Sequence, residues 1–256
     1  MKKTIIFVFA LLIFACVYAV ADGLAITPTR IEILVDRNGV AQAFFLVTNN
    51  YADVAEVDVT VADWNSYKGN GNLDINSWLK ISHPHISLEP GETKKVMIDV
   101  EASNSMVGSV SGQVSFSMRP PKTGGVTLKM SYPVYVTIRG TEKINYDISK
   151  VTVDGGDGRD ITIQMFFENR GNVHLRPSGK IKVYDSKKNL VYTADVPENF
   201  PVYAGMTSSF ASFGTIPASL KLAPGMYTAK IVMTARDKKA KKKVKFRIRT
   251  DNSVIY

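Results

Sequence analysis

Residues Val126–Arg139 have the sequence VTLKMSYPVYVTIR, in which every even-numbered position is apolar and most odd-numbered positions are polar. This alternation places apolar side chains on one face of the backbone and polar side chains on the other, which predicts a β-strand. The segment is more than twice as long as a typical strand of about 5–6 residues. Pro133 lies inside it and cannot donate a backbone hydrogen bond, so we expect this part of the strand at a sheet edge or at a break. A long apolar edge invites pairing with another chain.

Outside this segment, short alternating runs recur between turns rich in Gly, Pro, Asn and Asp, and no sustained 3.6-residue period follows residue 21. This pattern is typical of an all-β protein built from immunoglobulin-like β-sandwiches. The first of these runs, Ala25–Val35, is predicted to be one strand.

The second half of the chain repeats features of the first. Candidate strands end at Asn49 in the first half and at Asn169 in the second, and Pro224-Gly225 resembles Pro90-Gly91 as the turn before a strand. The sequence therefore predicts two similar sandwich domains joined by a short linker, with a cleft between them, at residues 22–140 and 141–256.

The first residues predict export. Two lysines precede the apolar run Ile5–Val20, and Ala19-Val20-Ala21 fits a small-x-small cleavage site, so residues 1–21 are expected to be a signal peptide. The run is shorter than the ~20 residues that a membrane-spanning helix needs. Lipidation at Cys16 is disfavoured, because a bulky aromatic residue precedes it where small residues are expected. Cys16 is the only cysteine, so the exported chain is expected to be stable without a disulfide.

The positive charge is concentrated at one place. The formal net charge is +9, and eight basic residues fall within Lys238–Arg249. This local charge, together with export, argues against nucleic-acid binding. Val244, Phe246 and Ile248 alternate with basic residues, which gives an apolar face and a charged face. Two interpretations are open: a contact with an anionic envelope component, or an edge strand that lysines protect from aggregation, which is favoured.

Catalytic, metal and cofactor sites are not predicted. The three histidines, His83, His85 and His174, accompany no Gly-x-Ser-x-Gly motif. His83 and His85 could offer two metal ligands, but a third is not evident nearby. No glycine-rich phosphate loop precedes a helix, so neither a nucleotide nor another small-molecule substrate is expected.

Five segments follow one another along the first half of the chain. They are an arginine-bearing segment, a predicted strand ending in asparagine, a turn, a predicted strand ending in a diproline and the long alternating strand. In this sequence these are Pro28–Ile31, Phe44–Asn50, Leu88–Gly91, Gly112–Pro121 and Val126–Arg139. Their order resembles that of periplasmic pilus-assembly chaperones of the chaperone–usher type, mainly over residues 25–140.

The resemblance implies which residues bind a partner. Alternate residues of the long strand, here Val126, Leu128 and Met130, would fill the groove of an incomplete pilin-like subunit by strand addition; the alternative is that they face the domain's own core. Arg30 matches the first of two basic residues that bind the subunit's terminal carboxylate, although it could instead pair with a neighbouring acid. The second, a lysine in the family, falls at Tyr135.

The resemblance thus implies a non-enzymatic periplasmic chaperone that needs no cofactor and caps secreted β-rich, pilin-like subunits, with an outer-membrane usher as a second partner. The alternative is a structural or adhesive immunoglobulin-like envelope protein. The tyrosine at position 135 and the weaker resemblance of the second domain favour that alternative.

Overall fold

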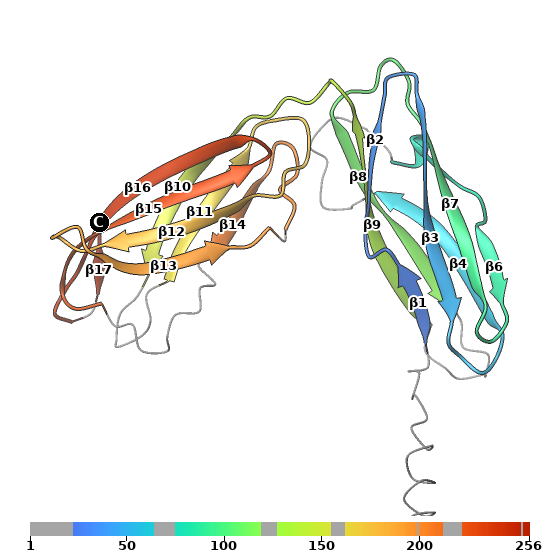
Figure 1. Ribbon diagram of the computed structural model, residues 1–256, viewed down its shortest axis with the longest axis horizontal. Coiled ribbons are helices and arrows are strands. Elements are labelled where there is room, and N and C mark those ends of the chain that lie inside the picture. Colours follow the sequence, from blue (N-terminus) through green and yellow to red (C-terminus); the bar gives the residue numbers. More distant parts are fainter. Residues whose placement is uncertain are drawn as a thin grey trace, which may run out of the picture.

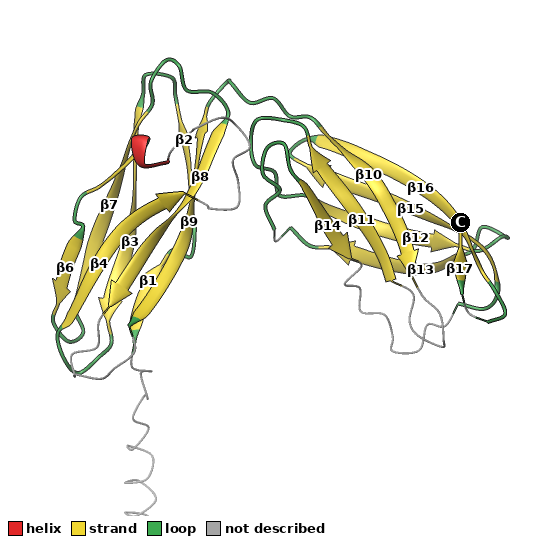
Figure 2. Ribbon diagram, turned by 180° about the vertical axis from the view of Figure 1, so that it is seen from behind, coloured by secondary structure: helices red, strands yellow, loops and turns green. Residues whose placement is uncertain are grey.

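The computed structural model describes residues 23–63, 75–118, 127–154, 162–198, 200–211, 222–251 and 253–256, so the predicted signal peptide lies outside the described residues. The described chain consists mostly of β-strands, and its one helix is a short 3₁₀ turn (Figure 2). In this part of the chain, no helix has the length and apolarity needed to span a bilayer.

The first sandwich contains nine strands and the helix η1 (Ile75–Ser77). The strands are β1 (Leu24–Thr27), β2 (Ile31–Val35), β3 (Val40–Asn49), β4 (Ala55–Asp63), β5 (Leu79–Ile81), β6 (His85–Leu88), β7 (Thr93–Glu101), β8 (Ser109–Met118) and β9 (Leu128–Ile138). They form two sheets, with strand orders β1-β3-β7-β5 and β2-β9-β8-β4-β6, that pack face to face (Figure 1).

The second sandwich follows the same plan. Its strands are β10 (Tyr146–Asp154), β11 (Thr162–Asn169), β12 (Ser178–Tyr184), β13 (Leu190–Val196), β14 (Thr207–Ala211), β15 (Gly225–Ala235), β16 (Lys238–Ile248) and β17 (Val254–Ile255). The strand orders are β10-β11-β14 and β13-β12-β15-β16-β17. These orders are those of an immunoglobulin-like fold, in which one sheet carries the first, second and fifth strands. The predicted all-β class with two such sandwiches is confirmed.

Each sandwich has its own hydrophobic core, because alternate residues of each strand face inward. In β2, for example, Ile31, Ile33 and Val35 are buried while Glu32 and Leu34 are exposed. The first core contains Phe45 and Phe116, whose rings meet edge to face at 5.4 Å. The second core is a separate set of buried residues centred on Phe167, Ile181 and Met233. Two separate cores make two sandwiches that are each stabilised by their own apolar burial.

The prediction of one strand over Ala25–Val35 is wrong. The chain forms β1, which pairs with β3, and then crosses to the opposite sheet, where β2 pairs with β9. Pro28 lies between the two strands, and because proline has no backbone N–H it cannot continue a ladder. The break allows the first segment to contribute to both sheets.

A buried asparagine joins neighbouring loops in each sandwich, at the end of β3 in the first and at the end of β11 in the second. The Nδ2 group of Asn49 donates to the carbonyls of Leu88 (3.0 Å) and Asp53 (2.9 Å), and Oδ1 accepts from the Tyr51 N–H (2.9 Å). Such a residue satisfies backbone groups that the ends of strands leave unpaired.

Asn169 has the same role in the second sandwich. Its Nδ2 group donates to the carbonyls of Val202 (2.9 Å) and Val173 (2.8 Å), and its Oδ1 accepts from the Gly171 N–H (3.0 Å). Both asparagines are fully buried. The two strand ends that the sequence marked as similar are therefore built alike.

A left-handed glycine completes each of these loops. Gly91, with φ of 77°, donates its N–H to the Asn49 carbonyl, and Gly205, with φ of 73°, donates to the Asn169 carbonyl, both at 2.8 Å. Glycine adopts positive φ at little cost. The structural counterpart of Pro90-Gly91 is therefore Ala204-Gly205, before β14. The expected counterpart, Pro224-Gly225, instead leads into β15.

Candidate functional site

Strand β9 is paired along nearly its whole length on one edge and along only about half of the other. It pairs with β8 from Leu128 to Thr137, and in parallel with β2 from Val134 to Ile138. On the β2 side, residues 128–133 have no strand partner within the described part of the chain. Pro133 lies directly before the first residue that pairs with β2. The open half of β9 therefore has backbone groups available for another strand.

The apolar row of β9 passes from the core to this open half. Val134, Val136 and Ile138 are fully buried, whereas Leu128 is 37% exposed. Between them, Met130 and Tyr132 are partly buried and pack against the first core. This gradient in burial follows the cover of the neighbouring edge, since β2 pairs with β9 only from Val134 onward.

Backbone contacts join the two sandwiches where β9 ends and β10 begins. The Ser109 N–H donates to the Asn172 carbonyl (3.0 Å), and the His174 N–H donates to the Ser109 Oγ (3.0 Å). Gly108 has φ of 74°, and a Cβ at this position would lie 2.3 Å from the Asn172 carbonyl oxygen. Glycine is therefore required for this close approach.

Stacked rings extend this contact between the sandwiches, which we call the junction and which contains Arg30, Glu32, Tyr135, His174, Arg176 and Tyr203. The ring of Tyr135 stacks on His174, with centroids 4.4 Å apart, and lies nearly parallel to Tyr203 at 6.4 Å. The guanidinium of Arg176 lies 5.0 Å from the centroid of Tyr135. Tyr135 is 3% exposed. These contacts bury aromatic area between the sandwiches and orient Arg176.

Glu32 connects the charges of the junction. Its Oε1 atom accepts a hydrogen bond from the Nε of Arg176 (3.1 Å) and lies 3.4 Å from the Nε of Arg30. Its Oε2 atom is 4.0 Å from the Nε2 of His174. His174 and then Arg176 lower the pKa of Glu32 to about 2, although burial opposes the shift. The carboxylate thus stays ionised at neutral pH and pairs with both arginines.

Four of the five residues predicted to bind a partner fall at two places. Leu128 and Met130 lie on the open half of β9, and Arg30 and Tyr135 lie at the junction. Val126 lies outside the described residues. Their role in binding stays a prediction.

The sequence did not point to Arg176 or Tyr203, and it offered His174 only as a catalytic candidate. Arg176 is 144 positions from Glu32 in the chain. No local pattern links residues so far apart, so only the packing of the two sandwiches brings them together.

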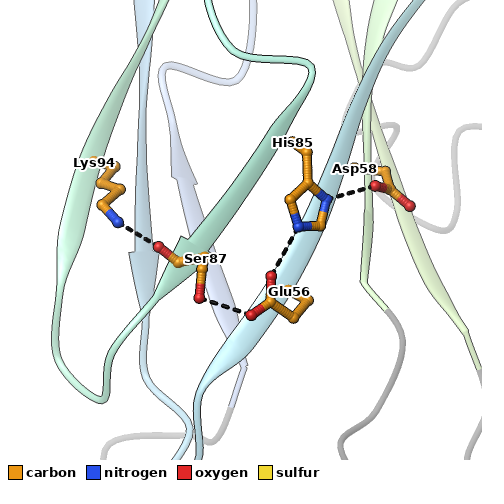
Figure 3. Close-up of polar contacts among 5 residues, drawn as sticks. All are labelled: Glu56, Asp58, His85, Ser87 and Lys94. Carbon is orange, nitrogen blue, oxygen red and sulfur yellow. Dashed lines mark hydrogen bonds and ion pairs between the residues drawn. The ribbon is translucent and has the colours of Figure 1, made fainter.

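A second polar cluster consists of exposed side chains on β4 and β6 (Figure 3). When protonated, His85 donates from Nδ1 to Asp58 (2.7 Å) and from Nε2 to Glu56 (2.8 Å). Ser87 also donates to Glu56 (2.7 Å). The bonds to Asp58 and Glu56 raise the pKa of His85. Within the described ranges, no group of three or more His, Cys, Asp or Glu side chains could hold a metal ion.

Comparison with known proteins gives similarity in structure but not in sequence. No family model matches the chain, and no curated protein matches it. Among solved structures, the periplasmic chaperone SfaE is 13% identical, with a TM-score of 0.46, and the match covers 91% of this chain and 97% of that chain.

Two further similar structures are likewise a chaperone and a complex that contains a chaperone. The Escherichia coli chaperone DraB is 12% identical over 87% of this chain and 98% of that chain, with a TM-score of 0.45. The Acinetobacter baumannii CsuC–CsuE chaperone–tip subunit complex is 14% identical over 87% of this chain and 97% of that chain, with a TM-score of 0.45. At these identities and TM-scores, function has to be argued from the geometry of the site itself.

Proposed function

We propose that this chain is a periplasmic chaperone for secreted β-rich, pilin-like subunits, and that it binds them by strand addition to the open half of β9. The observation that carries the proposal is that β2 pairs with β9 only from Val134 onward. Residues 128–133 therefore offer unpaired backbone groups next to an apolar row. The proposed activity is binding and not catalysis, and it requires no cofactor.

The energetics of this mode are favourable. In strand addition, backbone hydrogen bonds supply affinity and alternate side chains in pockets supply selection. Full burial of a side chain such as Leu or Met contributes about 1.5–3 kcal/mol. Leu128, which is 37% exposed, and Met130, which is partly buried against the first core, retain a part of this free energy for a partner.

The junction would anchor the subunit's terminal carboxylate. Arginine binds carboxylates through charge-assisted, often bidentate hydrogen bonds. In the free protein Glu32 supplies the carboxylate that pairs with Arg30 and Arg176. An incoming carboxylate would compete with Glu32 for Arg30, whose side chain is half exposed.

Affinity purification of the tagged protein from its native envelope, with mass spectrometry of the recovered proteins, tests this function. The wild type should recover a small secreted β-rich subunit in stoichiometric amount. Leu128→Asp should abolish recovery, because it places a charge in the apolar row. Ser131→Asp is the matched control, because it adds the same charge on the opposite, exposed face of β9. Urea unfolding should show that both variants remain folded.

Two results would refute the strand-addition mode. One is that Leu128→Asp still recovers the subunit. The other is that Leu128→Asp unfolds the protein while Ser131→Asp does not, which would make Leu128 a core residue.

A second candidate function is that of a structural or adhesive envelope protein without chaperone activity. One observation favours it: Glu32 already pairs with both arginines, and Tyr135 is buried against His174. Under this function the purified protein would come alone or only with further copies of itself. Genes for an usher or for pilin-like subunits beside its own would instead support the chaperone.

A further inference from the structure

The outer face of the second sandwich carries an array of cations on three adjacent strands. Eight exposed basic side chains lie on β12, β15 and β16. We call this array the basic face; it consists of Lys180, Lys182, Lys230, Lys239, Lys241, Lys243, Lys245 and Arg247. The sequence pointed only to the members on β16, because those on the other two strands are distant in the chain.

The pairing register places like charges directly opposite each other. Lys182 on β12 is opposite Lys230 on β15, which is opposite Lys243 on β16. The three lysines therefore form one row across three strands. Like charges at directly opposite positions destabilise an antiparallel pair. Such a row costs stability, so its presence calls for a role other than folding.

Protection of an exposed edge explains only part of this array. Strand β16 pairs with β17 only at Arg247 and Ile248, so its lysines can protect the remaining edge from aggregation. Strands β12 and β15, however, lie inside the sheet, with a neighbour on each side. Edge protection therefore does not account for Lys182 and Lys230. The Nζ of Lys230 lies 4.6 Å from the centroid of the Tyr184 ring, whereas its opposite neighbours Lys182 and Lys243 are cations.

Negative charge on these strands is nearly absent. Strands β12, β13, β15 and β16 are described in full, and Asp195 on β13 is their one acidic residue. It pairs with Lys180 at 3.1 Å. The remaining cations of the basic face have no acidic partner on these four strands, so the face attracts anions.

We propose that the basic face binds the anionic headgroups of a lipid bilayer surface. Alternate residues of a strand are about 6.8 Å apart and neighbouring strands about 4.8 Å apart, so the cations extend in two directions. A linear polyanion would cover one stripe of this array, whereas a plane of phosphate headgroups covers all of it. Seven of the eight residues are lysines, which act as point charges and suit diffuse phosphate groups better than bidentate recognition.

Vesicle sedimentation tests the proposal. The exported protein should sediment with vesicles that contain phosphatidylglycerol and remain free with phosphatidylcholine alone, which controls for binding that does not depend on headgroup charge. Raising the ionic strength to about 1 M, where the Debye length is about 3 Å, should release it. The triple variant Lys182→Gln, Lys230→Gln, Lys243→Gln should lower the apparent affinity at least about tenfold.

A matched triple variant distinguishes the effect of the basic face from the effect of the protein's net charge. Lys80→Gln, Lys95→Gln, Lys150→Gln removes three exposed lysines from β5, β7 and β10 and should bind as the wild type does. Equal loss in both triple variants would overturn the proposal, as would equal binding to phosphatidylcholine. Binding to heparin without binding to either kind of vesicle would mean that the basic face binds a linear polyanion, and would overturn the proposal that it binds a membrane.

Discussion

Strands β9 and β16 occupy equivalent places in the two sandwiches. Each has 11 residues and pairs with the strand that precedes it in the chain. On its other edge, each is covered only toward its C-terminal end, β9 by β2 and β16 by β17. Both sandwiches therefore leave part of an edge without a strand partner among the described residues.

The two strands differ in the side chains at these open segments. In β9 the inward positions of the open half carry Leu128, Met130 and Tyr132, whereas in β16 an inward position carries Lys242. An inward-facing lysine makes pairing with another strand costly, because the charge would be buried. The comparison teaches that backbone geometry creates an open edge and that side chains determine whether it can accept another chain.

The largest expected effect concerns the buried asparagine that the two sandwiches have in common. Asn49→Ala should lower the free energy of unfolding of the first sandwich by about 3 kcal/mol, because it leaves buried backbone carbonyls without a donor. Asn169→Ala should do the same in the second sandwich. Urea unfolding measures both, with the neighbouring, less buried Asn50→Ala as control. An effect below that of the control would show that the two asparagines do not organise the loops.

Placing a lysine at an inward position of β9, as in β16, tests whether the side chains at the open edge determine binding. Met130→Lys gives β9 an inward lysine and should weaken binding of the proposed subunit at least about fivefold, which corresponds to the loss of about 1 kcal/mol from the part of the Met130 side chain that is still exposed. Isothermal titration with the subunit recovered from the envelope measures the loss. Lys129→Met, on the outward face, should leave the affinity unchanged; unchanged affinity in Met130→Lys as well would remove β9 from the binding site.

The reverse substitution, of an inward lysine of β16 by an apolar residue, should allow the open edge of β16 to pair with a second copy of the protein. Lys242→Met removes the inward charge from β16 and should raise the stability of the monomer by up to about 1 kcal/mol, while the protein begins to self-associate as its concentration rises. Sedimentation velocity over a concentration series measures this association. Lys243→Met, which changes the outward face, should remain monomeric. A monomeric Lys242→Met would mean that β16 needs no protection.

The junction gives a smaller, pH-dependent effect. The folded-state pKa of Glu32, about 2, lies below the ordinary value of 4.5, so its ion pairs stabilise the fold fully above about pH 4.5. This contribution is lost as pH falls through 2. Melting temperatures of the wild type and Glu32→Gln should therefore differ at pH 7 and converge in acid. A constant difference at every pH would contradict the interaction of the Glu32 carboxylate with His174 and Arg176.

The smallest effect is expected at the edge strand β6 of the first sandwich. The pKa of His85 is raised by its bonds to Asp58 and Glu56, so this contribution is complete below the ordinary pKa of 6.5. It is lost as pH rises through the higher folded-state value. Wild type and His85→Gln should differ slightly in melting temperature near pH 5.5 and agree in alkali. A difference that grows with pH would reverse the assigned sign.

The sequence by itself determined the fold class of this protein. Period-two alternation, with turns between the runs, predicted strands because side chains of a strand alternate between two faces. Asn49 and Asn169 marked equivalent strand ends, because their side chains complete the hydrogen bonds of the loops. These are local signals, since each depends on residues close together in the chain.

Tertiary structure alone decided how distant segments meet. It split Ala25–Val35 between two sheets, left residues 128–133 of β9 uncovered, and brought Glu32 to Arg176. It also aligned lysines from β12, β15 and β16 into one face. Strand register and the packing of the two sandwiches fix these contacts, and neither is encoded in the spacing of neighbouring residues.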